Sequence, residues 1–324
     1  MASLGVIFQP SFPPERLRPA AQRAERARIA ELWVFEDCFR EGGIASVTAA
    51  LAATERIRIG VGILPMPLRN VAALAMEAAT IERLFPGRLR LGVGHGVLDW
   101  MGQVGARAAS PLTLMREYVP ALRGLLAGEE VTVDGRYVQL DHVRLDWPPA
   151  APVPVLAAGE GPKTLGVTGE VADGTILTTG TSPDMVRTAV ERIRAARTAA
   201  GRGGQHEIVV FLMTDFGHGS AERMEAEFDA WGLAGERRTA AVGDDEAVAA
   251  GVAALVEAGA TTVLLQSLAH EADLDRWMDS AARIAARDWG RDPSRHPRSR
   301  RPPRARGPAL DPRASPPLDD ADPG

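Results

Sequence analysis

Two stretches of alternating hydrophobic residues have nearly the same sequence, RIRIGVG at residues 56–62 and RLRLGVG at residues 88–94. In the first stretch Ile57, Ile59 and Val61 fall on one face and the intervening residues on the other, which is the period of a β-strand. Both stretches end in glycine, where a chain turns or lets another group approach closely. Each is therefore expected to be one strand that delivers its last residues to a site.

Six further apolar runs predict strands, at residues 4–8, 32–35, 153–158, 174–179, 207–215 and 261–266. Helical patterns fall between the strands, at residues 15–29, 45–54, 71–84, 112–126, 164–171, 184–199, 221–231, 246–258 and 274–287. Asn70 is well placed to cap the third of these helices. Strand and helix alternate eight times, which favours a single parallel (β/α)8 TIM barrel over an open doubly wound sheet.

Three segments do not fit this alternation. Residues 131–140 carry Asp-Gly between two strand-like runs and predict a β-hairpin outside the barrel. Residues 97–110 and the insert before the last strand are candidate lids over a site. From Gly290 onward arginine, proline and aspartate dominate, so residues 1–289 are expected to form the barrel domain and residues 290–324 a disordered tail.

Composition narrows the class of protein. The chain has 324 residues, of which 45% are hydrophobic, and its formal net charge of -5 gives no reason to expect a nucleic-acid partner. The lone cysteine, Cys38, rules out an internal disulfide and fits a reducing compartment. Neither a signal peptide nor a run long enough to cross a membrane is found, so a cytoplasmic protein is expected.

Several common site patterns fail on position. The stretch GVGHGV at residues 92–97 has its third glycine one residue too early for a dinucleotide-binding loop. The first strand has no histidine pair, so no metal site is expected. A Schiff-base lysine would lie inside a strand, whereas Lys163, the only lysine in the chain, lies at a predicted helix start.

The loop from Gly159 to Lys163 is the better candidate for a binding site. It places two glycines and an ammonium at a helix N-terminus, where free N–H groups and the helix dipole favour an anion such as phosphate. The next strand exit, Gly180 and Thr181, adds a hydroxyl and backbone donors. The alternative interpretation is that both are ordinary capped turns.

Three side chains at strand exits are candidates for chemistry. His95 lies between two glycines that leave the backbone open around it, although it could equally be a core or turn residue. Asp37 and Cys38 end the second strand, where a barrel opens onto its site. The alternative for this pair is a helix cap and a small buried thiol.

Several of these stretches, taken together and in order, resemble the luciferase-like flavin-dependent oxidoreductases, particularly the actinobacterial members described as using the deazaflavin coenzyme F420. The resemblance covers roughly Leu4 to Arg287. The stretches that carry it are WVFED at residues 33–37, GILP at 62–65, PLRN at 67–70, LFPGRLRLGVG at 84–94, AAGEGPKTL at 157–165 and ADG at 172–174.

This resemblance implies a cofactor, either F420 or FMN, whose ring lies over the C-terminal ends of the strands and whose phosphate lies on the loops after the fifth and sixth strands. Family members often have a non-proline cis peptide at the end of the third strand, which by position is Gly62–Ile63 here. The cofactor-binding residues implied in this way are Gly62, Ile63, Gly94, Gly159, Gly161, Lys163, Gly180 and Thr181.

One departure concerns the chemistry. Some F420-dependent dehydrogenases of this family carry Asp-His at the end of the second strand, whereas this chain has Asp37-Cys38, so His95 is the remaining imidazole expected near the substrate as acid or base. The expected activity is hydride transfer to, or monooxygenation of, a small organic substrate by a homodimer. The alternatives are a non-catalytic flavin- or ligand-binding barrel and an unrelated phosphate-binding barrel enzyme.

Overall fold

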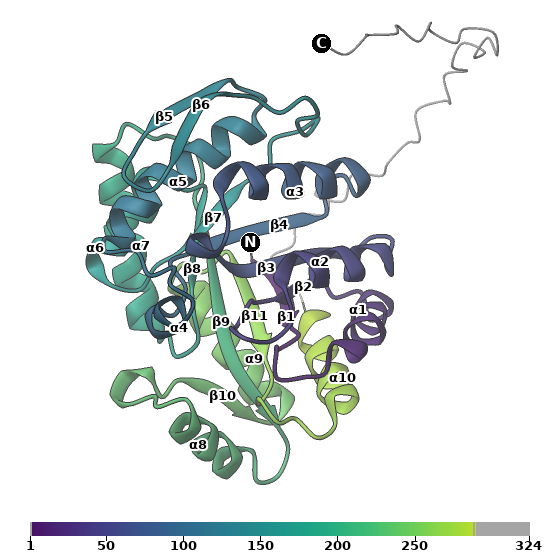
Figure 1. Cartoon of the computed structure of the whole chain (residues 1–324). Coiled ribbons are helices and arrows are strands. Elements are labelled where there is room, and N and C mark those ends of the chain that lie inside the picture. Colours follow the sequence, from purple (N-terminus) through teal and green to yellow (C-terminus); the bar gives the residue numbers. More distant parts are fainter. Residues whose placement is uncertain (1, 288, 290–324) are drawn as a thin grey trace, which may run out of the picture. The chain divides into compact units, whose positions relative to one another are not determined.

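Eight parallel strands close into a barrel, as the alternation of strand and helix predicts (Figure 1). The structure is a computed structural model and describes residues 2–287 and 289. Strand β9 pairs with β11 on one side and with β8 on the other, which closes the sheet. The barrel strands in spatial order are β1 (Ser3–Ile7), β2 (Glu31–Val34), β3 (Arg58–Pro65), β4 (Leu89–Gly94), β7 (Val155–Ala158), β8 (Gly174–Leu177), β9 (Glu207–Phe216) and β11 (Thr262–Gln266).

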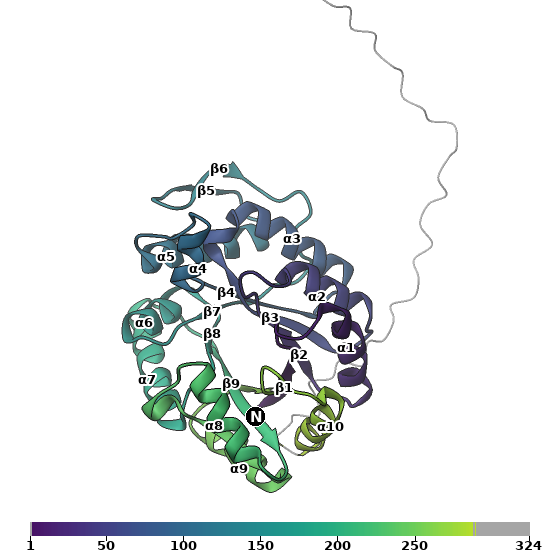
Figure 2. The same ribbon diagram turned by 60° about the horizontal axis from the view of Figure 1, so that its bottom comes forward.

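Eight helices follow the strands and form the outer ring (Figure 2). They are α1 (Leu17–Arg26), α2 (Gly43–Ala52), α3 (Val71–Leu84), α5 (Pro111–Leu126), α6 (Pro162–Val171), α7 (Pro183–Ala199), α9 (Asp245–Glu257) and α10 (Leu274–Ala285). The side chain of Asn70 accepts a hydrogen bond from the Ala72 N–H, which confirms the predicted cap of α3. Within the described residues no helix is both long and apolar enough to cross a bilayer.

The remaining elements lie in three insertions and two short turns. The predicted hairpin is confirmed as β5 (Val131–Asp134) and β6 (Gln139–Val143), which form a separate antiparallel sheet. The residue 97–110 segment contains a helix that was not predicted, α4 (Leu98–Gln103). Single 3-10 turns η1 (Pro14–Arg16) and η2 (Met66–Leu68) follow β1 and β3. The β9–α9 insert, residues 217–244, holds α8 (Ser220–Ala230), the 3-10 turn η3 (Gly235–Arg237) and an unpredicted strand, β10 (Ala240–Gly243), beside the end of β9. The predicted disordered tail, residues 290–324, lies outside the described residues.

The glycines of the repeated strands make room inside the barrel. A Cβ at Gly60 would lie 2.2 Å from Cδ2 of Trp33, and one at Gly92 would lie 2.5 Å from Cδ1 of Ile176. Trp33 is fully buried in the lumen. The expectation that these glycines allow a close approach is therefore confirmed, and the groups that approach are core side chains.

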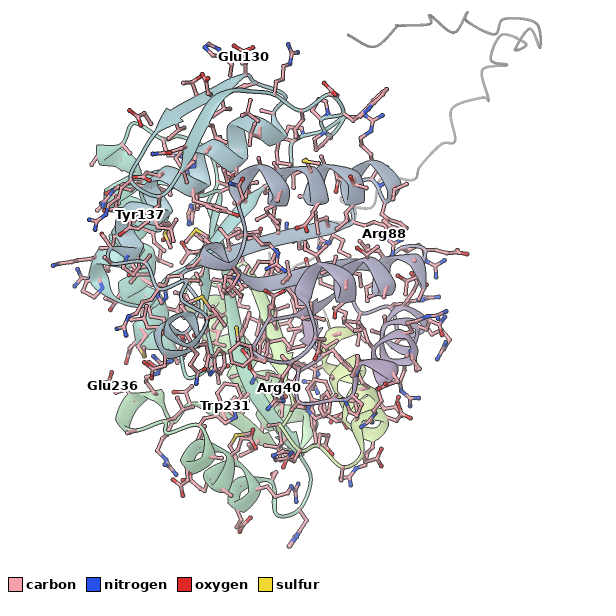
Figure 3. The ribbon with its side chains drawn as sticks, viewed as in Figure 1. Arg40, Arg88, Glu130, Tyr137, Trp231 and Glu236 are labelled. Atoms are coloured by element: carbon pink, nitrogen blue, oxygen red, sulfur yellow. The ribbon has the colours of Figure 1, made fainter. Side chains whose placement is uncertain are left out.

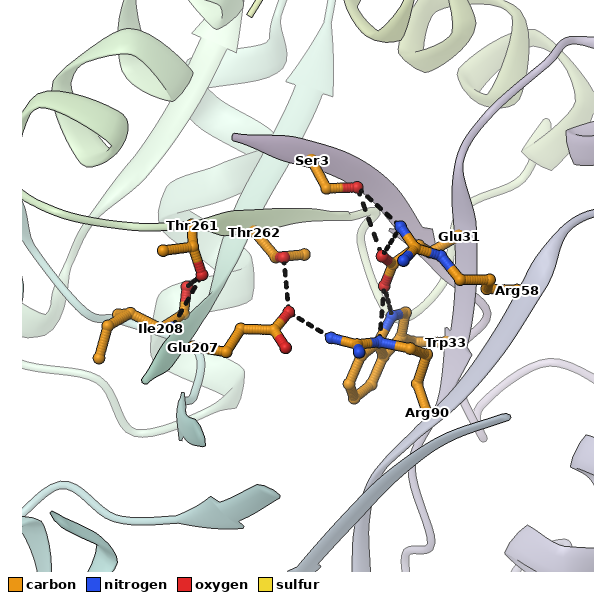
Figure 4. Close-up of polar contacts among 9 residues, drawn as sticks. All are labelled: Ser3, Glu31, Trp33, Arg58, Arg90, Glu207, Ile208, Thr261 and Thr262. Atoms are coloured by element: carbon orange, nitrogen blue, oxygen red, sulfur yellow. Dashed lines mark hydrogen bonds and ion pairs between the residues drawn. The ribbon is translucent and has the colours of Figure 1, made fainter. Parts of the chain in front are cut away.

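A network of charged side chains fills the N-terminal end of the lumen (Figure 4). The carboxylate of Glu31 accepts from the Trp33 indole N–H at 2.8 Å and forms an ion pair with Arg58 at 2.5 Å. Arg90 lies 3.6 Å from the same carboxylate and also pairs with Glu207. The two arginines occupy the first lumen-facing position of each repeated strand. This end of the barrel is thus closed by ion pairs, and the other end is left for a site.

Candidate functional site

The lumen ends in an apolar platform at the C-terminal ends of the strands. Lumen positions on six strands form one buried cluster, and Phe35, Ile63 and Ala158 pack on it while remaining partly exposed. The Phe35 ring is stacked on Phe211, with centroids 6.5 Å apart. The C-terminal mouth of the barrel therefore presents a small hydrophobic surface on a rigid base.

Strand β3 places Ile63 on this platform through a bulge. Its register with β4 shifts between Val61 and Leu64. The Gly62–Ile63 peptide is cis, as the resemblance implies, and a second cis peptide, Cys38–Phe39, was not predicted. A Cβ at Gly94 would lie 3.1 Å from Cγ1 of Ile63. The structure therefore brings together Gly62, Ile63 and Gly94, three of the predicted cofactor contacts.

The end of β2 carries one titrating carboxyl group. Asp37 is half-buried, and burial raises its pKa to about 6, with the charge of Glu41 acting in the same direction and Arg40 against it. Burial also raises the pKa of the Cys38 thiol, and the charges of Glu36 and Asp37 add to this effect. Cys38 is therefore a protonated thiol at neutral pH, which disfavours a role as nucleophile.

Glu36, the third polar residue of that strand end, has a structural role. It accepts two hydrogen bonds from Arg69, at 2.6 and 2.8 Å, and one from the Gly43 N–H at the start of α2. Its own N–H donates to the Ile63 carbonyl. Glu36 thus fixes the β2 exit against the β3 bulge and leaves Asp37 as the free carboxyl group.

His95 is half-buried just beyond β4, and its Nδ1 lies 2.6 Å from the Gly96 carbonyl oxygen. The imidazole is close enough to Glu160 to help lower the pKa of that carboxyl group. Among the described residues no hydrogen bond or ion pair joins His95 to Asp37 or Cys38. The residues predicted to take part in the reaction therefore lie in two places: Asp37 and Cys38 after β2, and His95 after β4.

Glu160 is held ionised by residues from two other segments. Arg237, in the β9–α9 insert, donates to its carboxylate at 2.5 and 3.2 Å and to the Thr179 carbonyl at 2.7 Å. The Thr178 hydroxyl also donates to Glu160. Partial burial works to raise the pKa of Glu160, but these hydrogen bonds and charges hold it below its usual value. Figure 3 marks Glu236, the neighbour of Arg237 in this insert.

The predicted phosphate loop has exposed donors. Lys163 is exposed at the second position of α6 and forms no ion pair within the described part of the chain. Gly161 is the N-cap residue of α6, and a Cβ there would meet nothing within 4 Å. Gly180 adopts a φ of +84°, and a Cβ there would lie 2.7 Å from the Arg237 carbonyl oxygen, so only glycine fits under the insert. The Thr181 hydroxyl donates to the Thr178 carbonyl and stabilises the turn.

Apolar side chains surround the mouth. Phe39 is 67% exposed after β2, and Val97 and Leu98 are 48% and 36% exposed after β4. Exposed hydrophobic residues gathered at one end of a soluble barrel commonly mark a binding surface. This rim is suited to an organic substrate with substantial apolar surface.

Two polar residues of the mouth, Glu160 and Arg237, were not among the predicted site residues. Glu160 could have been found, because it comes two residues after the lumen-facing Ala158 and so continues the inward face of β7. Asp37 follows Phe35 in the same way. Arg237 gives no comparable pattern, since it lies in a loop far along the chain from the residues it contacts.

The residues present fit a flavin or deazaflavin. Such a cofactor needs a flat apolar contact for its ring and hydrogen-bond donors or cations for its phosphate. Phe35, Ile63 and Ala158 supply the first, and the start of α6 with the unpaired Lys163 supplies the second. Groups of three or more side chains able to hold a metal ion are not found among residues 2–287 and 289.

Comparison with known proteins places this geometry in context. Residues 4–226 match the family described as luciferase-like monooxygenase. The 5,10-methylenetetrahydromethanopterin reductase of Methanolobus tindarius is 30% identical over 200 residues, which cover 62% of this chain and 61% of that protein. The F420-dependent glucose-6-phosphate dehydrogenase of Kineococcus radiotolerans is 28% identical over 230 residues, 66% of this chain and 68% of that protein. The chain thus spans between 61% and 68% of the length of these two relatives.

A solved structure extends the likeness over nearly the whole barrel. The F420-dependent secondary alcohol dehydrogenase in complex with an F420-acetone adduct superposes with a TM-score of 0.79 at 21% identity. The superposition covers 89% of this chain and 99% of that one. At this identity the likeness concerns the fold, and it confirms the predicted barrel.

Proposed function

Because the chain belongs to the luciferase-like monooxygenase family, we propose that it is an oxidoreductase whose cofactor is the deazaflavin coenzyme F420, with FMN as the alternative. The observation that carries this proposal is the pairing of the apolar platform with the donor-rich start of α6 at one barrel mouth. The F420-dependent relative from Kineococcus radiotolerans supports the deazaflavin. Bound there, F420 supplies hydride transfer, whereas reduced FMN supplies oxygen activation.

The roles of this chain's residues follow from their environments. Ile63 and the backbone at Gly62 and Gly94 would contact the cofactor ring, and Lys163 and the N–H groups near Gly161 would hold its phosphate. Further phosphate donors would be the backbone N–H groups of the turn at Gly180 and Thr181, since the Thr181 hydroxyl already donates within the turn.

Two carboxyl groups at the mouth have pKa values shifted in opposite directions, which is the usual arrangement of an acid or base beside a fixed charge. Asp37, with a pKa of about 6, exchanges a proton with the substrate near neutral pH. Glu160 stays ionised, and its negative charge lies near the imidazole of His95. Cys38 lines the same strand end as a neutral thiol.

Water exclusion comes from the inserts. The β9–α9 insert is fastened to the mouth by Arg237 through Glu160 and the Thr179 carbonyl. The apolar rim of Phe39, Val97 and Leu98 covers other sides of the mouth. We infer a small organic substrate with apolar surface, since charged substrates would find few partners on this rim.

The deciding experiment is a parallel titration of the purified protein with F420 and with FMN, each in the oxidised and reduced form. Micromolar binding of F420 alone supports hydride transfer, and a preference for reduced FMN supports an oxygenase. Binding of neither would overturn the proposal.

The phosphate contact is tested with Lys163→Gln, compared with Arg194→Gln, which removes an exposed cation in the body of α7. We expect Lys163→Gln to weaken cofactor binding about threefold to tenfold, as is typical of an exposed charged contact, and Arg194→Gln to leave it unchanged. Equal effects of the two variants would mean that only overall charge matters. Loss of turnover with unchanged cofactor affinity in His95→Asn or Asp37→Asn would favour the enzyme over a barrel that merely stores cofactor.

A further inference from the structure

One arginine joins the two loops that carry the acid group and the ring contact of the proposed site. Asp37 lies in the loop from β2 to α2, and Ile63 lies in the β3 bulge, which leads into the loop to α3 (Figure 1). Arg69 lies near the end of that second loop and reaches back to Glu36, the residue before Asp37. Arg69 was not among the predicted site residues.

The contact between Arg69 and Glu36 is close and largely buried. The two terminal nitrogens of the guanidinium donate to the two carboxylate oxygens, one to each, at 2.6 and 2.8 Å. The side chain of Arg69 is 19% exposed and that of Glu36 is 8% exposed. Two parallel hydrogen bonds between planar groups fix their orientation as well as their distance. We call this pair the Arg69–Glu36 clamp.

The arginine side of the clamp is anchored to the outer helix α3. The Arg69 N–H donates to the Met66 carbonyl and closes η2, and the next residue, Asn70, caps α3. The carboxylate of Glu77, in the second turn of α3, lies 3.7 Å from Nε of Arg69. The guanidinium is thus located relative to α3 both through its own backbone and through a second carboxylate.

The carboxylate side of the clamp is anchored to the mouth. The Glu36 N–H donates to the Ile63 carbonyl at 3.3 Å, and the Glu36 carboxylate also accepts from the Gly43 N–H at the start of α2. The Cα atom of Asp37 is about 3.8 Å from that of Glu36, so a displacement of Glu36 moves Asp37 as well. Among the described residues the Asp37 carboxyl makes no hydrogen bond or ion pair that would hold it independently. Its position therefore depends on the backbone that Glu36 fixes.

We propose that Arg69 is a positioning residue of the site, which acts through Glu36 to hold the Ile63 ring contact and the Asp37 carboxyl at one fixed separation. This inference rests on the function proposed above, because it requires a cofactor ring on Ile63. The desolvation of two buried charges offsets most of their attraction, so an ion pair behind a site is better explained by the geometry it enforces than by stability. Geometry matters there, since a misplacement of reacting groups by about 1 Å can cost about 100-fold in rate.

The bound cofactor reports on the clamp, so the test needs no substrate. Affinity is measured by titration with F420 and with FMN, and the visible circular dichroism of the bound cofactor reports how its ring is held. The variants of the full chain are Arg69→Met, Arg69→Lys and a double variant that combines Arg69→Met with Glu36→Gln. The matched control is Arg116→Met, which removes a similar two-bonded pair with Glu170, at 2.8 and 3.3 Å, on the outer surface.

We expect Arg69→Met to weaken cofactor binding about tenfold and to change the circular dichroism, because the ring contact loosens when the hydrogen bond behind it is lost. Arg69→Lys should recover part of both, since an ammonium has the charge without the planar fork, and Arg116→Met should change neither. The double variant separates geometry from stability. It leaves no unpaired buried charge, so its melting temperature should return towards that of the wild type, while its affinity and circular dichroism stay as in Arg69→Met.

Binding of neither cofactor by the wild type would remove the proposed function and this inference with it. Where the wild type binds cofactor, the inference alone is overturned if Arg69→Met keeps the wild-type affinity and circular dichroism. It is equally overturned if the double variant regains both together with its melting temperature, because the clamp would then only stabilise the fold. Should Arg69→Met fail to fold, the double variant takes its place in the comparison with the wild type and Arg116→Met.

Discussion

Glu31→Gln tests whether the ion network at the closed end of the barrel determines its stability. Glu31 is 1% exposed, and its carboxylate is surrounded by Arg58, Arg90, the Trp33 indole and the Ser3 hydroxyl. Burial works to raise the pKa of this carboxyl, but the two arginines and the hydrogen bonds hold it below the usual value of 4.5. Glutamine keeps the shape and an acceptor for the indole, and removes only the charge.

The expected loss follows from what remains after the substitution. The side chain of Arg90 is 11% exposed and would retain only Glu207, whereas the side chain of Arg58 is 39% exposed and can be solvated. Removing one partner of a buried ion pair typically costs 3–5 kcal/mol, and since one arginine reaches water we expect the lower end, about 3 kcal/mol. Because the folded-state pKa is depressed, this contribution is present above pH 4.5 and is lost as the pH falls below it.

Urea denaturation at pH 7 gives the free energies of unfolding. The matched control is Glu170→Gln, whose carboxylate pairs with Arg116 at the surface at 2.8 Å and whose loss should cost roughly 0–1 kcal/mol. A loss for Glu31→Gln no larger than that of the control, or a loss that persists unchanged at pH 3, would refute the reasoning.

Three further substitutions test other parts of the molecule. Gly60→Ala places a Cβ 2.2 Å from Trp33 and should lower the free energy of unfolding by about 1–3 kcal/mol or more. The control is Gly166→Ala, a helical position where a Cβ meets nothing within 4 Å, and it should raise the free energy of unfolding by up to about 1 kcal/mol. Equal changes in the denaturation midpoints of the two variants would contradict this. Asp37→Asn should abolish the limb near pH 6 in the pH profile of kcat/KM, and an unchanged profile would exclude Asp37 as the titrating group. Burial, together with two nearby arginines, lowers the pKa of His206 to about 4, so stability should fall by about 3 kcal/mol as the pH drops from 6.5 to 4; His206→Asn, melted over the same range, should lack this slope.

The strands of this protein could be predicted because the lumen and the outer face of the barrel impose opposite requirements on alternate residues. In β4, and in β3 as far as its bulge, the outward residues are all aliphatic, while the inward residues are an arginine followed by glycines. That pattern predicts a strand, but it does not say what fills the space above a glycine. Only the structure shows that Trp33 and Ile176 occupy it.

The candidate site could be predicted only in part, for a related reason. Asp37 and Glu160 continue the inward face of their strands, so local alternation is enough to place both at the mouth. The contact between Arg237 and Glu160 joins residues 77 positions apart and depends on how the β9–α9 insert folds back, which no local pattern encodes.

The contrast between the two ends of the barrel explains why chemistry belongs at only one of them. At the closed end, Glu31, Arg58, Arg90 and Glu207 compensate one another, so no charge is available to a ligand. At the mouth, the same inward positions end in Asp37, whose pKa is raised, and in Glu160, which is compensated by an arginine from an insert rather than from a strand. The Glu160 carboxylate is therefore neutralised at the mouth by Arg237, whereas Asp37 has no ion-pair partner among the described residues and keeps a raised pKa.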